Sequence, residues 1–239
     1  MMFGVLILGL LVGLQHATEA DHVAAVASLT TRSRSLREAA RLGTAWGIGH
    51  TLTLLVFAGG VLLIGAAIHA EVALWLETVV AVMLIGLGAD VLRRLWSERI
   101  HFHSHQHGSK THFHAHSHDA RTEHAADPHK HSHRRQLPLR SLLVGMMHGM
   151  AGSAALIVFA LGAVQSPWQG LLYILLFGIG SIIGMVLLAV VISFPLRWSA
   201  KSLTWAHNGL TAVFGIATIA IGGFLLHGTT AELLGSAVF

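Results

Sequence analysis

The chain has 239 residues, of which 54% are hydrophobic and only 11% charged, and its formal net charge is +4 at pH 7. Together with a mean hydropathy of +0.66, this composition excludes an ordinary soluble domain and indicates an integral membrane protein. The absence of cysteine excludes disulfides, thiolate metal sites and thiol nucleophiles.

Six apolar stretches are each long enough to cross a bilayer as a helix, for which about 20 residues suffice. They cover approximately residues 3–29, 42–68, 73–97, 139–164, 169–193 and 205–227. No basic segment precedes the first stretch and no A-x-A-type cleavage site follows it, so we expect a mature span rather than a signal peptide. The sequence therefore predicts an all-α integral membrane protein with six transmembrane helices.

The first stretch contains the polar segment HATEADH, with His16, Glu19, Asp21 and His22. A charged group in mid-membrane costs about 2.5–3.5 kcal/mol on insertion scales, so acids at that depth usually belong to a site or a pathway. On one continuous helix, at about 100° per residue, His16, Glu19 and His22 share a face while Asp21 points elsewhere. Two imidazoles and a carboxylate on one face can bind one divalent cation. The alternative is a structural polar cluster that joins helices.

The donor types restrict which cation such a site would bind. Nitrogen and oxygen donors suit Ni²⁺, Co²⁺ or Zn²⁺ better than Cu⁺, which prefers sulfur. Asp21 could orient a ligand histidine, or join the site if the helix unwinds there. His50, in the second stretch, and His148, in the fourth, are further candidate ligands, although a lone histidine in a membrane more often joins helices by a hydrogen bond.

A polar linker, residues 101–135, divides the chain into a first membrane unit (1–100) and a second (136–239). Twelve of the 19 histidines lie between His101 and His133, and we expect this linker to be disordered because it has few large apolar residues. Its alternating histidines are candidate metal-buffering ligands, since a flexible chain can gather several imidazoles. These are His101, His103, His105, His107, His112, His114, His116 and His118. The alternative is a solvated linker with incidental affinity.

The two membrane units resemble each other. GLQHATEADHVAAVASL from Gly13 aligns without gaps with GMMHGMAGSAALIVFAL from Gly145, and WGIGH from Trp46 aligns with FGIGS from Phe177. A repeat with three spans must insert its second copy upside down, as in transporters with inverted repeats. We therefore expect a 3+3 inverted repeat.

The distribution of basic residues predicts the orientation of the six spans. All fifteen Lys and Arg residues fall on one side of this arrangement, which the positive-inside rule assigns to the cytoplasm. The histidine-rich linker is then cytoplasmic and both termini lie outside. Nucleic-acid binding is not expected, because the basic residues are split over three loops.

The motif HATEADH resembles the HALDADH signature of the nickel/cobalt transporter family, and GIGHT, around His50, resembles that family's second motif. The resemblance implies a permease for Ni²⁺ or Co²⁺ in which His16, Asp21, His22 and His50 are the matching positions. The six-span length and the absence of the family's later acidic motif are similar to the short branch found near urease genes. A related exporting branch has Gly where Asp21 stands, so Asp21 favours import.

We therefore expect a transporter of Ni²⁺ and/or Co²⁺ in the inner membrane that takes the ion up into the cytoplasm. The ion is the substrate, no prosthetic group is expected, and cytoplasmic metallochaperones are candidate partners beside the bilayer. The alternatives are an efflux permease for Ni²⁺, Co²⁺ or Zn²⁺, an intramembrane zinc-dependent hydrolase and bis-histidine haem binding. The sequence leaves the oligomeric state open.

Overall fold

The computed structural model describes residues 2–31, 33, 35–64, 69–97, 101–107, 110–116, 138–151, 166–202 and 204–236. Within these ranges the helices are α1 (Met2–His16), α2 (Ala20–Thr30), α3 (Leu36–Ile64), α4 (Ala70–Ser97), α5 (Leu139–Ala151), α7 (Pro167–Ser202) and α8 (Thr204–Ser236). Two strands, β1 (His101–His107) and β2 (Lys110–His116), form an antiparallel hairpin. The membrane part of the described chain is therefore all-α.

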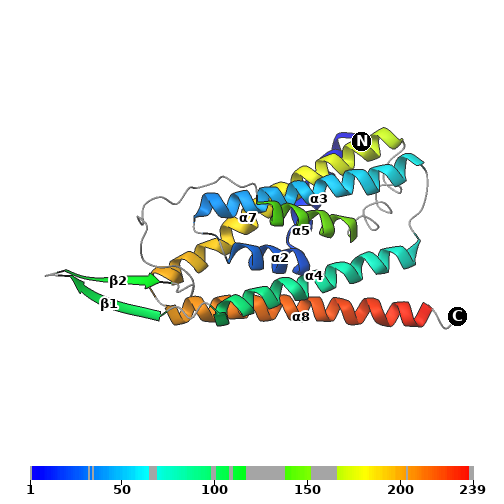
Figure 1. The fold of residues 1–239 in the computed structure, drawn as a ribbon. Coiled ribbons are helices and arrows are strands. Elements are labelled where there is room, and N and C mark those ends of the chain that lie inside the picture. The colour runs from blue at the N-terminus through cyan, green and yellow to red at the C-terminus, as the bar shows by residue number, and fades with distance from the viewer. Residues whose placement is uncertain are drawn as a thin grey trace.

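The helices form an elongated bundle in which long helices enclose short ones (Figure 1). The long helix α3 packs along α7 on one side of the bundle, and α4 packs along α8 on the other side. The short helices α2 and α5 lie between these two pairs (Figure 1). Polar residues on the short helices are thereby enclosed by apolar helices.

Four helices of the described chain are long and apolar enough to cross a membrane: α3, α4, α7 and α8. They cover the second, third, fifth and sixth predicted spans, although α7 continues past Pro195 to Ser202, beyond the predicted end at 193. Only the first part of the fourth predicted span is described, as α5, and residues 152–165 lie outside the described chain. Bulky apolar side chains such as Phe224 (80% exposed) and Trp198 (67%) face outward, as expected in lipid.

The expectation of one continuous first helix was wrong. Helix α1 ends at His16, residues 17–19 form a turn, and α2 begins at Ala20. The backbone of Glu19 is extended, with φ −63° and ψ 148°, while the hydroxyl of Thr18 donates to the carbonyl of Gln15 at 2.6 Å. A side-chain hydrogen bond of this kind offers the chain an alternative to continued helix. In a bilayer such a break is tolerated where it is buried in protein or lines a cavity.

The linker differs from the expected disorder at residues 101–107 and 110–116, where β1 pairs with β2. The register places His101 opposite His116, His103 opposite His114 and His105 opposite His112. Alternation of histidine with other residues has the period of a strand, which explains why this segment can pair. Of the eight candidate buffering histidines, His118 lies outside the described residues.

One kind of close contact between helices recurs with the two halves of the chain exchanged. Gly13 on α1 lies so close to the carbonyl oxygen of Phe177 on α7 that a Cβ would collide with it. In the same way, Gly145 on α5 lies against the carbonyl oxygen of Trp46 on α3. Both positions require glycine, because only a residue without a side chain permits this approach.

The main core lies around α2 and the inner faces of α3, α4 and α7. It includes the fully buried side chains of Trp46, Leu84 and Met185. Hydrogen bonds between hydroxyls reinforce this packing, as between Ser28 on α2 and Thr218 on α8, at 2.9 Å. The polar residues described next stand at the edge of this core.

Candidate metal centre

Four helices bring five of the predicted site residues together. His16 is the last residue of α1, Asp21 and His22 lie in the first turn of α2, His50 lies on α3 and His148 lies on α5. His22, His50 and His148 are 1%, 0% and 2% exposed. Buried imidazoles from separate helices thus converge in the middle of the bundle.

The turn at residues 17–19 decides this arrangement. It places the ring of His22 against that of His16, with ring centroids 4.3 Å apart, and it directs Asp21 inward rather than away. The expected placement of Asp21, which assumed a continuous helix, was therefore wrong. The sequence had left open that Asp21 joins the cluster if the helix unwinds, and the structure has this arrangement.

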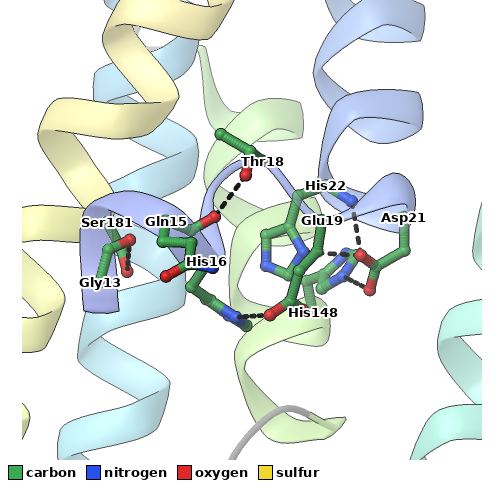
Figure 2. Close-up of polar contacts among 9 residues, drawn as sticks. All are labelled: Gly13, Gln15, His16, Thr18, Glu19, Asp21, His22, His148 and Ser181. Carbon is green, nitrogen blue, oxygen red and sulfur yellow. Dashed lines mark hydrogen bonds and ion pairs between the residues drawn. The ribbon is translucent and has the colours of Figure 1, made fainter. Parts of the chain in front are cut away.

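The carboxylate of Asp21 links two histidines (Figure 2). Nδ1 of His22 donates to Oδ1 of Asp21 at 2.8 Å, and the backbone N–H of His22 donates to the same oxygen at 2.8 Å. Nε2 of His148 donates to Oδ2 at 2.8 Å. Because an ionised carboxylate only accepts hydrogen bonds, these ring nitrogens carry the protons and the opposite ring nitrogens present lone pairs.

Several ring nitrogens at the cluster have no hydrogen-bond partner within the described part of the chain. They are buried, and they comprise Nε2 of His16, Nε2 of His22, both nitrogens of His50 and Nδ1 of His148. An unsatisfied buried polar group costs about 1–3 kcal/mol. A cation would satisfy these lone pairs, and a carboxylate behind a ligand histidine is the usual arrangement at metal sites.

The potential ligand atoms form two overlapping groups. One ligand atom from each of His16, His22 and His50 lies within 4.8 Å of the others, and the same holds for Asp21, His22 and His148. His22 belongs to both groups. The cluster could thus bind a divalent cation through three imidazoles, or through two imidazoles and a carboxylate.

Glu19, which we expected on the same face as His16, belongs to neither group. Its carboxylate accepts a hydrogen bond from Nδ1 of His16 at 2.8 Å (Figure 2), and its side chain is 55% exposed. This contact leaves Nε2 of His16 open toward the cluster. Glu19 thus contacts a candidate ligand without belonging to either ligand group.

A cavity of about 650 Å³ reaches the cluster. Its walls include His16, Glu19, Asp21 and His148, and also Glu77 of α4. Glu77 lies near the start of the third predicted span, and nothing in the sequence of α4 shows which of its faces packs against α2. The cavity gives a hydrated cation room to approach the imidazoles, along a wall that carries several carboxylates.

Two aromatic rings complete the cluster, and neither could be assigned to it from the sequence. The indole of Trp46 lies behind the histidines, with ring centroids 5.2 Å from His22 and 5.5 Å from His148. Phe177 lies 5.1 Å from His16 in the same measure. Trp46 and Phe177 occupy equivalent positions in the repeat. Their rings surround the imidazoles with apolar surface, which strengthens electrostatic interactions at the cluster.

Comparison with known proteins gives one family match and two relatives. Residues 4–217 match the family described as "Cytochrome C biogenesis protein transmembrane region". The chain is 34% identical to the urease accessory protein UreH of Bacillus sp. (strain TB-90) over 222 residues, which cover 92% of this chain and 90% of UreH. It is 26% identical over 207 residues to the chloroplast protein FOR GROWTH AND FERTILITY 2 of Arabidopsis thaliana, covering 83% of this chain but only 51% of that protein. No solved structure matches the chain significantly.

Proposed function

Because the chain belongs to the family of membrane proteins that includes the urease accessory protein UreH, we propose that it is a permease for Ni²⁺ or Co²⁺. It is a membrane protein and not an enzyme, in keeping with an accessory protein and a transmembrane region as its relatives. The proposal depends on one observation above all: buried imidazoles with open nitrogens stand around a carboxylate at the wall of a cavity.

The choice of ion follows from the donors and from the family. Imidazole nitrogen and carboxylate oxygen suit Ni²⁺ and Co²⁺, and the chain has no cysteine that would favour a softer ion. UreH is an accessory protein of urease, and urease is a nickel enzyme. The likeness of HATEADH and GIGHT to the motifs of nickel/cobalt transporters supports the same ions.

Transport, rather than storage, is supported by the exchanged contacts of the two halves. Besides the pairs at Gly13 and Gly145, a Cβ at Gly49 would collide with the carbonyl oxygen of Leu142, and one at Gly180 with that of Leu10. Gly49 is the repeat equivalent of Gly180, and Leu142 is that of Leu10. Such pairing is expected of two inverted three-span repeats, which alternate access around a site at their interface.

We propose uptake through an inner membrane, with both termini outside and the residue 101–135 linker in the cytoplasm. This orientation rests on the positive-inside rule, since all fifteen Lys and Arg residues fall in or beside three loops on the same side. The ion would be passed to the linker histidines and from there to cytoplasmic metallochaperones. Deleting residues 101–133 should change affinity or regulation while basal transport continues, and complete loss of uptake would reject the buffering role.

The decisive test is uptake of Ni²⁺, Co²⁺, Zn²⁺ and Mn²⁺ into metal-free proteoliposomes that contain the full chain. We expect uptake of Ni²⁺ or Co²⁺ by the wild type and its loss in His16→Ala and Asp21→Ala. His227→Ala is the matched control, because it removes an exposed imidazole of α8 that belongs to neither ligand group. Equal uptake by the wild type and both site variants would refute the permease. If vesicles preloaded with the ion released it faster than empty vesicles took it up, the protein would instead be an efflux permease.

A further inference from the structure

His22 stands between two histidines that come from equivalent positions of the two repeats. Its ring centroid is 4.3 Å from that of His16 on one side and 4.2 Å from that of His148 on the other. In the sequence alignment of the halves, His16 and His148 coincide. The most central imidazole is therefore flanked by one histidine from each half.

The surroundings of His22 differ on these two sides. Toward His148 lies the carboxylate of Asp21, which accepts hydrogen bonds from both rings. Toward His16 lies His50, with ring centroids of His16 and His50 5.4 Å apart, and its nitrogens have no hydrogen-bond partner among the described residues. One side therefore offers imidazoles alone, and the other offers an imidazole with a carboxylate.

We propose that the two ligand groups are successive positions of a single ion and that His22 hands the ion from one to the other. This inference rests on the proposed transport function. In the first position the ion is bound by His16, His22 and His50, and in the second by His22, His148 and Asp21. A neutral imidazole has one lone pair, so the two positions are filled alternately, and the single ring proton of His22 resides on the nitrogen that the ion has left. When Asp21 binds the ion it gives up its hydrogen bonds from the two rings, and the ring proton of His148 likewise moves to the nitrogen that faces away from the ion.

Both positions can be reached from the cavity. His16 of the first position and Asp21 of the second line its wall, with side chains 14% and 22% exposed, whereas the shared His22 is 1% exposed. A shared ligand keeps the ion bound during the step, which avoids the cost of releasing it into a dry interior. Conduction in general requires several sites of moderate affinity rather than one deep site.

The experiment measures binding and flux separately on the purified full chain. Nickel binding is measured by equilibrium dialysis, and the ligand set by X-ray absorption, with His22→Ala as the blank. Because His22 belongs to both positions, subtracting this variant removes the contribution of the linker histidines and leaves the two positions. We expect the wild type to bind one more nickel ion per chain than His22→Ala does.

The single variants should separate the positions. His16→Ala should still bind one ion, with fewer imidazoles and a carboxylate in its spectrum, and His148→Ala should bind one ion with three imidazoles. Both should lose flux by at least about tenfold, a loss typical of disturbed metal sites, because an ion that binds in one position cannot proceed. His16→Asn and His148→Asn, which keep a polar side chain, should behave in the same way and so exclude misfolding as the cause.

Two results would overturn the hand-over. Loss of the ion in either single variant would indicate one joint site, and wild-type flux in His148→Ala would remove the second position. Absence of flux in the wild type, with the binding results as expected, would instead refute the transport function while leaving two positions established.

Discussion

His50 and Ser181 occupy equivalent positions in the two halves of the chain, and their polar atoms have different surroundings. The hydroxyl of Ser181 donates to the carbonyl oxygen of Gly13 at 3.1 Å (Figure 2). Both nitrogens of His50 are buried without a hydrogen-bond partner in the described part of the chain. A buried polar group that has a hydrogen-bond partner in the protein is explained by structure alone. A buried polar group without a partner destabilises the fold, and a bound ligand can offset that loss of stability. The first half therefore carries most of the candidate ligands, and the second half adds His148.

The backbone differs between the halves as well. Helix α1 ends at His16, but α5 continues through Ala151, three residues beyond the equivalent His148. The turn of the first half has its own side-chain hydrogen bond, from Thr18 to Gln15, and methionine stands at both corresponding positions of the second half, Met150 and Met147. One half thus turns polar side chains inward, while the other presents a single histidine from an unbroken helix.

The largest effect should come from making the first half like the second at His22, whose repeat equivalent is Ala154. His22→Ala removes the residue shared by both ligand groups. We expect uptake in proteoliposomes to fall by more than about 100-fold. Loss of a residue that only hydrogen-bonds to a metal ligand lowers metal affinity or activity by about 10–100-fold, and loss of the ligand itself should lower uptake further. His227→Ala provides the comparison, and a His22→Ala protein with more than half the control uptake would contradict the asymmetric site.

The two acids of the first half should differ in importance. Asp21→Asn disturbs the two hydrogen bonds that orient His22 and His148 and replaces a ligand of the second position, so nickel uptake should fall by about 100-fold. Glu19→Gln disturbs one contact of a side chain that is 55% exposed, and its effect should be several times smaller. Initial rates of uptake measured side by side test the order, and a larger loss in Glu19→Gln would reverse the roles given to the two acids.

Much of this site could be predicted from the sequence, because ionisable groups are costly in a membrane and stand out there. His16, His22, His50 and His148 were selected on that ground, and the structure brings them together, although metal binding by them stays a prediction. The turn at residues 17–19 could not be predicted, since ATE contains neither proline nor glycine. The direction of Asp21 depended on that turn.

Features of the site that depend on contacts between helices could not be predicted from the sequence either. Glu77 and Trp46 reach the site only through the packing of α4 and α3 around α2. Four of the predicted spans were recovered because length and hydropathy alone define a membrane helix. The strands at residues 101–107 and 110–116 differ from the disorder that composition indicated, although the alternation of histidine with other residues has the period of a strand.

Alanine substitutions at the equivalent glycine contacts of the two halves should have similar effects, whereas substitutions at equivalent positions of the metal site should not. Gly13→Ala and Gly145→Ala each force a methyl group against a backbone carbonyl, so each should lower the free energy of unfolding by about 1–3 kcal/mol, as overpacking does. Gly86→Ala is the control, since a Cβ there meets nothing within 4 Å, and it should be neutral or slightly stabilising. Thermal unfolding in detergent measures all three. A clear loss of stability in only one of the two variants, Gly13→Ala or Gly145→Ala, would contradict the equivalence of the contacts.

The smallest effect should come from Ser181→Ala, which removes a hydrogen bond whose purpose is structural. The hydroxyl contributes about 0.5–1.5 kcal/mol as a buried hydrogen bond, and the acceptor carbonyl of Gly13 still serves the backbone of α1. The melting temperature should therefore decrease slightly, while nickel affinity and uptake stay at the wild-type level. His50→Ala at the equivalent position should do the opposite, reducing uptake strongly, because its nitrogens contribute no hydrogen bond within the described chain. If Ser181→Ala reduced uptake as much as His50→Ala, the hydroxyl of Ser181 would be a ligand too, and the contrast between these two equivalent positions would be wrong.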